Sequence, residues 1–497
     1  MSESFVLGVN AVPLLESTTD AVILPAFEDQ EWTGSLSGAD ETLGGWLGEV
    51  RWRGEFRGEA NQVVILSSLG HVGAARLVML GLGKGANLSV SGWRNAVATA
   101  CRALGRRGIR SVALDLGDVP LERAAAAEAA AEAAVLSRFH TTLYRTGTTR
   151  DESIHELRVG NAAEADLTRG GILGQAKNWS RNLVNEPGNV LTAPELARRA
   201  AEMAGAVGLG CEILETEVLE RLGMGAFLAV ARGSRTPPKL IELSHNPPNA
   251  PQSPILALVG KAVTFDTGGI SLKPAAEMGR MKGDMAGGAA VLGAMRAIAQ
   301  LGIPLRVVGL VPAVNNMPDG NAWMPGDVVT AMSGKTIETI STDAEGRMLL
   351  ADAIHYARTR GATHVVDIAT LTGACVTALG HVASGLFSND QELADLLCGC
   401  GEEAGEHHWP MPLFPEYREL IRSDIADLKN SGGRTAGAIT AACFIREFAG
   451  DAPWAHLDIA GSSQYEKARP WAPAGPTGTG VGTFARLAAR MAARAQG

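Results

Sequence analysis

Short apolar runs alternate with longer amphipathic or Ala-rich stretches along the first third of the chain. Short, mainly apolar segments at 21–24, 62–66 and 76–80 have the length of buried strands. The segments 93–104 and 121–137 have the length of helices, and the Ala/Glu-rich part of the second, 124–135, is expected to form an exposed helix. This alternation predicts an α/β domain.

A polar stretch at 141–160 marks a boundary, and the same pattern resumes more densely after residue 190. A helix is predicted over 164–185, ended by Asn185-Glu186-Pro187-Gly188. The apolar run 255–259 is typical of a central strand buried on both faces. Further strands are predicted at 305–314, 336–340 and 364–369, and helices at 287–301 and 347–360.

The fold class is therefore α/β with two domains. We predict a smaller N-terminal α/β domain over 1–160, a linker helix over 161–189, and a larger C-terminal α/β domain over 190–497. The larger domain should have a central, mostly parallel sheet flanked by helices. Ligands of such folds gather beyond the carboxyl ends of the strands, so the loops there should carry the chemistry.

Composition narrows the class of protein. A chain of 497 residues that is 46% hydrophobic can bury a large core in two or three domains. A net charge of −9 argues against a dominant nucleic-acid-binding role. The six cysteines follow no pattern, and we find no basic and apolar leader and no run of about 18 apolar residues. Together these features predict a reduced, cytoplasmic location without a membrane span.

Three motifs imitate binding sites. The glycines of 81–85 follow a strand but break the spacing of a dinucleotide fingerprint. Ser333-Gly334-Lys335-Thr336 ends like a phosphate loop, but Val329 stands where that loop requires glycine, so a tight turn is the better interpretation. The pair His407-His408 is interpreted as part of a solvated polar loop rather than as a metal site.

Two segments concentrate acidic residues at predicted strand ends. Lys261 ends an apolar strand, Asp266 and Asp284 lie in Gly-rich turns, and Asp343 and Glu345 lie two apart on a strand-to-helix turn. Four carboxylates converging on one cleft repel one another and raise each other's pKa. Divalent cations relieve that repulsion, and oxygen ligands without cysteine suit Mg, Mn or Zn rather than a structural zinc site.

Two basic residues complete this set. Paired metals about 3.5–4 Å apart activate water for hydrolysis. Lys273 and Arg347 add positive charge where a tetrahedral intermediate develops negative charge. Each acid taken alone is equally explained as a turn or cap residue; the whole set beside strand ends is not.

The same segments resemble the leucyl aminopeptidase (cytosol aminopeptidase) family. The family signature NTDAEGR followed by an apolar helix is matched here by STDAEGRMLLADAI, which begins at residue 341. An earlier block of the family is matched by GKAVTFDTGGISLKP, from residue 260, and MKGDMAGGAA, from residue 281. The resemblance covers roughly residues 180 to 490; the first domain matches only in general pattern.

The resemblance implies a peptidase that removes N-terminal residues, preferably leucine and other apolar ones, by attack of a water that bridges two metals. It implies two divalent ions per subunit, Mn or Zn with Mg and Co as alternatives. One ion would be held by Lys261, Asp266, Asp284 and Glu345, and the other by Asp266, Asp343 and Glu345. As a ligand Lys261 must be neutral, which requires a pKa strongly lowered by the adjacent cations.

The resemblance also implies catalytic and substrate-binding roles. Lys273 would polarise the scissile carbonyl, and Arg347 would hold a bicarbonate that acts as general base. The substrate α-amine would bind one metal and Asp284, which restricts cleavage to terminal residues. The substrate-binding residues would be Met281, Thr370, Leu371 and Gly373.

Partners and departures follow from the same comparison. The resemblance implies a homohexamer that acts on short peptides. Because some bacterial members of the family also bind DNA, a DNA-binding or regulatory protein is the alternative function, and an inactive scaffold is a third. Ser341 replaces the usual Asn of the signature, Ala262 stands where Gly is commoner, and Gly283 occupies a variable position; none is a proposed ligand.

Overall fold

The computed structural model describes residues 5–117, 119–147 and 151–496, so residues 148–150 of the polar boundary stretch lie outside the described residues. Contact density divides the chain into two compact units. The first contains Met1–Asn178 and Glu466–Gly475, and the second contains Trp179–Tyr465 and Pro476–Gly497. The division falls within a long helix that occupies Glu164–Asn185, the range that the sequence predicts.

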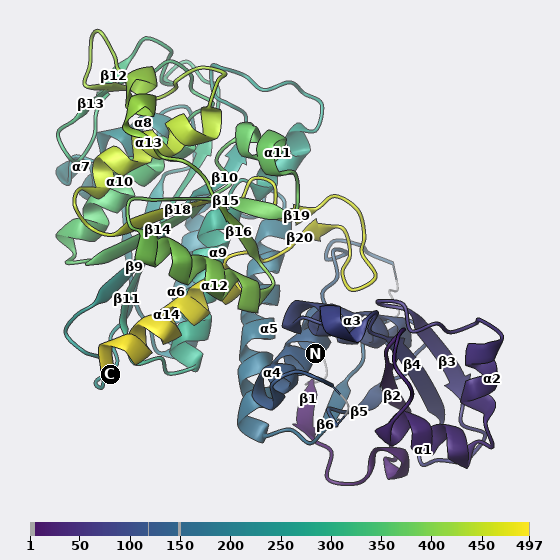
Figure 1. Ribbon diagram of the computed structural model, residues 1–497. Coiled ribbons are helices and arrows are strands. Elements are labelled where there is room, and N and C mark those ends of the chain that lie inside the picture. Colours follow the sequence, from purple (N-terminus) through teal and green to yellow (C-terminus); the bar gives the residue numbers. More distant parts are fainter. Residues whose placement is uncertain (1–4, 118, 148–150, 497) are drawn as a thin grey trace. The chain divides into compact units, whose positions relative to one another are not determined.

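The first unit is built on a six-stranded sheet in the order β1-β6-β5-β2-β4-β3 (Figure 1). All neighbouring pairs are parallel except β3 with β4. The strands are β1 Val6–Val9, β2 Ala21–Ala26, β3 Val63–Ser67, β4 Arg76–Gly81, β5 Ser111–Asp115 and β6 Glu156–Gly160. The helices are α1 Gly34–Thr42, α2 Trp46–Trp52, α3 Val90–Gly105, α4 Arg123–Ser137 and the first part of α5 Glu164–Asn185, with 3₁₀ turns η1 Leu14–Glu16 and η2 Gly85–Asn87.

The Ala-rich helix α4 is buried, so the prediction of an exposed helix over 124–135 was wrong. Its alanines pack against α3 and the sheet in one hydrophobic core. Small side chains on every face let a helix approach its neighbours closely, so the composition that suggested exposure serves tight packing instead. Its buried Glu132 pairs with Arg94 at 3.1 Å and Lys177 at 3.3 Å.

The second unit contains a nine-stranded sheet in the order β16-β15-β18-β14-β9-β11-β8-β7, with β10 paired to β11. Neighbouring strands are parallel among β18, β14, β9, β11 and β10. The antiparallel pairs are β15 with β18, β8 with β11 and β7 with β8. The strands are β7 Gly210–Leu214, β8 Lys239–His245, β9 Ile255–Gly260, β10 Ala262–Asp266, β11 Arg306–Asn316, β14 His364–Ala369, β15 Ala383–Ser388, β16 His407–Pro410 and β18 Trp454–Asp458. The prediction of a mostly parallel central sheet with helices is confirmed.

Helices cover both faces of this sheet (Figure 1). One layer contains α6 Ala193–Val207, α9 Ala286–Gln300, α12 Gln391–Ala404 and α14 Val481–Gln496, and the other contains α8 Gly225–Ala231, α10 Gly346–Thr359 and α13 Gly437–Ala449. The shorter helical elements are α7 Thr216–Arg221, α11 Gly373–Leu379, η3 Met278–Gly283 and η4 Pro415–Ile421. Because both faces are covered, the central strands are mostly apolar, and the buried Asp367 of β14 pairs with His456 of β18.

The segment predicted as a strand at 336–340 lies outside the central sheet. It forms β13 Thr336–Glu338 in a three-stranded sheet with β12 Val328–Thr330 and β17 Leu428–Lys429. A two-stranded ladder joins β19 Gln464–Tyr465 to β20 Gly475–Pro476. Among the described residues, no helix combines the length and apolar character needed to cross a bilayer.

Candidate metal centre

The predicted site residues gather beyond the carboxyl ends of the parallel strands. Lys261 directly follows β9, Asp266 closes β10, and Thr370 follows β14. Asp284 lies between η3 and α9, and Glu345 lies at the start of α10. This is the position that a parallel sheet covered on both faces gives to a ligand site.

One cluster forms around the buried ammonium of Lys261. Its Nζ lies 2.8 Å from Asp284 Oδ1, 2.8 Å from Glu345 Oε1 and 2.9 Å from the carbonyl oxygen of Thr370. A Cβ on Gly346 would lie 2.7–2.9 Å from the end of this lysine side chain, so glycine in the signature is required for the approach. The Thr370 hydroxyl donates to Asp284 Oδ1 at 2.7 Å.

A second cluster forms around Lys273. Its Nζ lies 2.8 Å from Asp266 Oδ2 and also pairs with Asp343. One carboxylate oxygen from each of Asp266, Asp343 and Glu345 lies within 4.8 Å of the others. Glu345 therefore belongs to both clusters, and all five proposed metal ligands lie in one site with Lys273.

The remaining predicted residues border these clusters. Arg347 is buried and donates from Nη1 to the carbonyl oxygen of Asn430 at 2.7 Å. Leu371 follows Thr370 and is half-buried, and Gly373 begins α11. Met281 lies half-buried in η3, and its carbonyl oxygen accepts from the Asp284 N–H at 3.3 Å.

The buried acids repel one another and would be stabilised by bound cations. Asp284 Oδ2 and Glu345 Oε2 are buried and accept no hydrogen bond from any described residue; Asp284 Oδ2 lies 2.8 Å from Lys261 Nζ without hydrogen-bond alignment. A buried carboxylate oxygen without a donor costs free energy that a coordinated cation offsets. A set of carboxylates and one amine is suited to Mn, Zn or Mg.

The electrostatics of the site have one cause, an excess of buried acids. Burial raises the pKa of Glu345 to about 8, and the charge of Asp266 adds to that rise. Burial raises the pKa of Asp284 to about 6. Burial alone would lower the pKa of Lys261, but the charges of Asp284, Glu345 and Asp266 outweigh it and raise that pKa. The pKa values of the acids and of the lysine are thus all raised, which is the effect of an excess of buried negative charge and favours bound cations.

The Arg347 guanidinium has unused hydrogen-bonding capacity. Its Nε is buried and donates to no described residue. Burial lowers its pKa to about 10, so it stays charged at neutral pH. A buried, charged donor of this kind is suited to an anion.

Sequence reasoning missed Asn316 and Thr342, which hold the Asp266 loop. Asn316, the last residue of β11, donates to Asp266 Oδ1 at 2.9 Å and to the carbonyl oxygen of Thr342 at 3.0 Å. The Thr342 hydroxyl donates to the carbonyl oxygen of Gly268 at 2.6 Å, where φ is +85°. A polar residue at the end of an apolar strand was the available signal for Asn316.

Asn430 holds the signature turn and Arg347 together. Its Oδ1 accepts from Ile340 N–H at 2.7 Å, its Nδ2 donates to the Ser341 carbonyl at 2.7 Å, and its own carbonyl binds Arg347. The Ser341 hydroxyl accepts from the Asp343 N–H at 3.2 Å, so the residue that departs from the signature still supports the turn.

Asp458, which closes β18, fixes the loop after β14. Its carboxylate accepts from the N–H groups of Leu371 at 3.2 Å and Ala460 at 3.1 Å, and from the Thr372 hydroxyl at 2.7 Å. Leu371 is one of the predicted substrate-binding residues. Asp458 therefore positions the loop that carries them.

Replacement of Asn430 by alanine is expected to lower the kcat/KM of the reaction at this site about 10- to 100-fold while metal content stays unchanged, because the support of Arg347 and of the turn is lost rather than a ligand. Kinetics and elemental analysis of the same preparation measure this. Asn321→Ala, on an exposed loop, is the control. A lowered melting temperature with unchanged kcat/KM would show that Asn430 is only structural.

The histidine pair lies apart from this site, and its interpretation as a solvated loop was wrong. His407 and His408 begin β16; His407 bonds Glu402, whereas His408 is buried and its Nε2 lies 2.9 Å from the Thr483 hydroxyl. Burial lowers the pKa of His408 to about 4. The preceding helix α12 brings this polar segment into the sheet edge.

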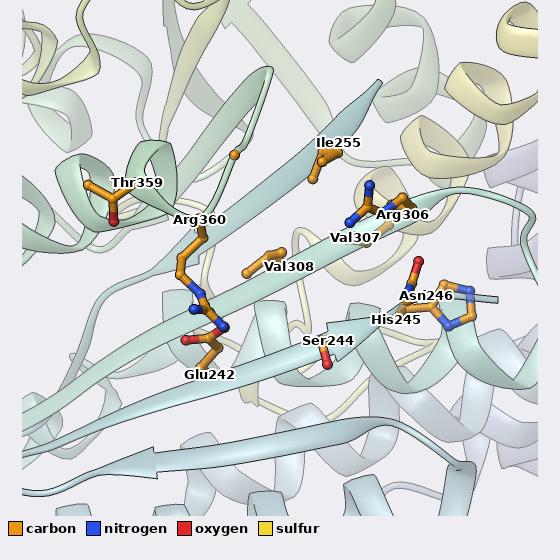
Figure 2. Close-up of a pocket in the computed structure, with 11 residues that line it drawn as sticks. Glu242, Ser244, His245, Asn246, Ile255, Arg306, Val307, Val308, Thr359 and Arg360 are labelled. Atoms are coloured by element: carbon orange, nitrogen blue, oxygen red, sulfur yellow. Dashed lines mark hydrogen bonds and ion pairs between the residues drawn. The ribbon is translucent and has the colours of Figure 1, made fainter. Parts of the chain in front are cut away.

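A cavity of about 430 Å³ lies at the opposite ends of the strands (Figure 2). Ile255 and Arg306, which line it, are the first residues of β9 and β11, whereas the acids follow the last. Figure 2 shows the Arg360 guanidinium beside Glu242, to which it donates at 2.9 Å. The cavity is separate from the cluster of acids.

Comparisons with known proteins match both parts of the chain. Residues 178–485 match the model of the cytosol aminopeptidase family, catalytic domain, and residues 23–148 match that of the N-terminal domain of the same family. A probable cytosol aminopeptidase of Solibacter usitatus is 45% identical over 97% of this chain and 98% of its own length. Another, of Syntrophotalea carbinolica, is 42% identical over 95% and 97%.

Solved structures of two related enzymes are similar to this chain over nearly its whole length. A tomato leucine aminopeptidase mutant superposes with a TM-score of 0.89 at 31% identity, covering 98% of this chain and 97% of that one. The bottromycin maturation enzyme BotP in complex with Mn superposes with a TM-score of 0.85 at 36% identity, covering 95% and 100%.

Proposed function

Because the chain belongs to the cytosol aminopeptidase family, we propose that it is a two-metal aminopeptidase of the leucyl type, which releases leucine and other apolar residues from the N-termini of peptides. Aminopeptidase activity follows from the family. The observation that carries the finer proposal is that Lys261, Asp266, Asp284, Asp343 and Glu345 lie in one site, with buried oxygens on Asp284 and Glu345 that accept no hydrogen bond from a described residue.

These five residues would hold two divalent ions, with Asp266 and Glu345 shared between them. Manganese is the first choice because the BotP structure contains it, and zinc the second. Such ions, when bound, acidify water and polarise the scissile carbonyl. The remaining steps belong to side chains of the chain itself.

Lys273 would stabilise the charge that develops on the carbonyl oxygen. Its ammonium lies beside Asp266 and Asp343, and their negative charges, with that of Glu345, outweigh burial and keep its pKa raised, so that it stays charged. A fixed positive charge at this position favours the transition state over the neutral carbonyl. Arg347, with its unpartnered Nε, would hold the bicarbonate that serves as general base.

Asp284 would make the enzyme an exopeptidase. Its Oδ1 is occupied by Lys261 and Thr370, whereas its Oδ2 accepts no hydrogen bond from a described residue. A terminal α-amine can donate to that acceptor and still offer a lone pair to a metal, whereas the lone pair of an internal peptide nitrogen is delocalised into its carbonyl. The loop at 370–373, held by Asp458, would orient the first residue of the substrate.

The side-chain preference is tested with tripeptides that differ only at the first residue. We expect kcat/KM for a leucine peptide to exceed that for glutamate or lysine peptides about 10- to 100-fold, as an apolar side-chain site would require. Mass spectrometry should show release of one terminal residue at a time. Equal rates for all first residues would contradict the apolar preference.

Metal loading should stabilise the fold as well as activate the enzyme. Adding manganese to the stripped chain is expected to raise the melting temperature by several degrees (order of magnitude), because binding to the folded state alone relieves the repulsion among the acids. Differential scanning fluorimetry measures this. Sodium chloride at the same ionic strength is the control, and an unchanged melting temperature at saturating manganese would contradict a metal centre in this cluster.

We further propose that the chain acts in the cytoplasm as a homohexamer, as the resemblance to the family implies. Sedimentation should then give six times the 51.8 kDa mass of the chain. A monomer with full activity on short peptides would contradict the hexamer and leave the chemistry of the site unaffected.

A further inference from the structure

The first unit contains a crevice that the aminopeptidase reaction does not use. The parallel neighbours β2 and β4 send the chain to opposite faces of their sheet. After β2 it forms α1 and α2, which share a core with Val22 and Leu24. After β4 it forms α3, which shares the other core with Ile23 and Val78. Adjacent parallel strands that diverge in this way leave a crevice beyond their carboxyl ends, where α/β folds bind ligands.

A cavity of about 430 Å³ occupies that position. Glu28 lies just beyond β2, and the backbone of Gly81–Gly83 forms the turn that ends β4. Leu82 and Leu88 contribute apolar wall, and the first turns of α3 form the far side. The volume lies within the range of small-molecule sites, about 300–1,000 Å³.

The polar side chains of this cavity have spare hydrogen-bonding capacity. Glu28, Lys84, Asn87 and Asn95 line it, and none of these four side chains has a hydrogen bond or ion pair with another described residue. Asn61 also lines it and accepts only from the Thr99 hydroxyl, at 3.3 Å. Asn95 is half-buried in the first turns of α3, whereas Glu28, Lys84 and Asn87 are exposed at the rim.

The chemistry of these groups selects the class of ligand. Amides such as those of Asn61 and Asn95 offer both donors and acceptors, which suits the edge of a nucleobase. Glu28 is an acceptor for sugar hydroxyls, and Lys84 supplies a single cation for one phosphate. The cavity is lined by one lysine, one glutamate and no arginine. It therefore lacks the positive charge needed to bind a triphosphate. The glycine spacing of 81–85 likewise lacks the fingerprint for a dinucleotide.

We propose that the crevice of the first unit binds a nucleoside monophosphate, at a site separate from the peptidase centre. The base lies toward Asn61 and Asn95, the sugar toward Glu28 and the phosphate toward Lys84. The proposal gives the N-terminal domain a ligand of its own and does not depend on the metal chemistry.

Isothermal titration of the full metal-loaded chain with AMP, adenosine and inorganic phosphate tests this. AMP should bind at one site per chain, adenosine more weakly, and phosphate weakest. Asn95→Ala and Lys84→Ala should each weaken AMP binding about tenfold, since each removes a hydrogen bond or charge contact. Arg107→Ala, an exposed cation near the other end of α3, should leave it unchanged. All three variants should retain peptidase activity, which shows that they fold.

Four results would overturn the proposal. The first is no saturable AMP binding at about millimolar concentration. The second is equal AMP affinity in the wild-type chain and both cavity variants. The third is AMP binding that disappears in Glu345→Ala, since that would place the nucleotide on the metals. Phosphate binding as tightly as AMP would also overturn it, because the cavity would then hold only a non-specific anion.

Discussion

Replacing Glu345 by alanine is expected to lower kcat/KM for leucine p-nitroanilide by about 10⁴-fold or more. Glu345 lies 2.8 Å from Lys261 and shares the carboxylate cluster with Asp266 and Asp343, so its loss affects both proposed ion positions. Removing a shared ligand removes the activation of water and of the carbonyl together. The rate should therefore fall to the level of the metal-stripped chain.

Elemental analysis distinguishes this cause from misfolding. The Glu345→Ala chain should retain less than its full complement of ions, whereas Glu220→Ala, on an exposed helix end, should retain both metal and activity. Glu345→Gln keeps the size of the side chain and should behave like the alanine variant. A Glu345→Ala chain that is metal-loaded and active would remove Glu345 from the site.

Lys273→Ala is expected to lower kcat about 10²- to 10³-fold with metal content retained. Lys273 pairs with Asp266 and Asp343. In the proposed mechanism it is a donor rather than a ligand, so its loss would remove stabilisation of the developing oxyanion. Because that charge forms in the transition state, KM should change little. Steady-state kinetics beside elemental analysis measure both.

The control for this variant is Lys467→Ala, which removes an exposed lysine. Lys273→Arg should recover part of the lost kcat, because the charge is kept and its geometry is changed. A Lys273→Ala chain whose KM rises while kcat stays constant would assign Lys273 to substrate binding rather than to catalysis.

The sequence predicted that the acids and lysines of the site lie together, and the structure places them in one cluster, because each lies beside the end of a strand or the start of a helix. Asp266, Asp284, Asp343 and Glu345 follow predicted strands or precede predicted helices, and parallel strands bring such positions to one edge. The helix over Glu164–Asn185 was also predictable, since Pro187 and Gly188 stop it. In these cases neighbours in sequence decide the structure.

Features that depend on distant neighbours were not predictable. Asn430 is 83 residues from Arg347, to which it bonds, and nothing in its own segment marks it. The alanines of α4 are buried because α3 packs on them, and His408 is buried because Thr483 lies beside it. The strand β13 lies in a small separate sheet, where it pairs with the nearby β12 and with β17, which lies about ninety residues later. Tertiary packing, not local pattern, decides each of these.

The most direct test of the account is hydrolysis of leucine p-nitroanilide by the purified chain, first stripped of metal and then supplied with manganese or zinc, beside the N-acetylated substrate. Release that requires added metal and fails when the α-amine is blocked is the predicted result. Hydrolysis that persists without metal, or that proceeds equally on the blocked substrate, would contradict a two-metal centre that recognises the free amine.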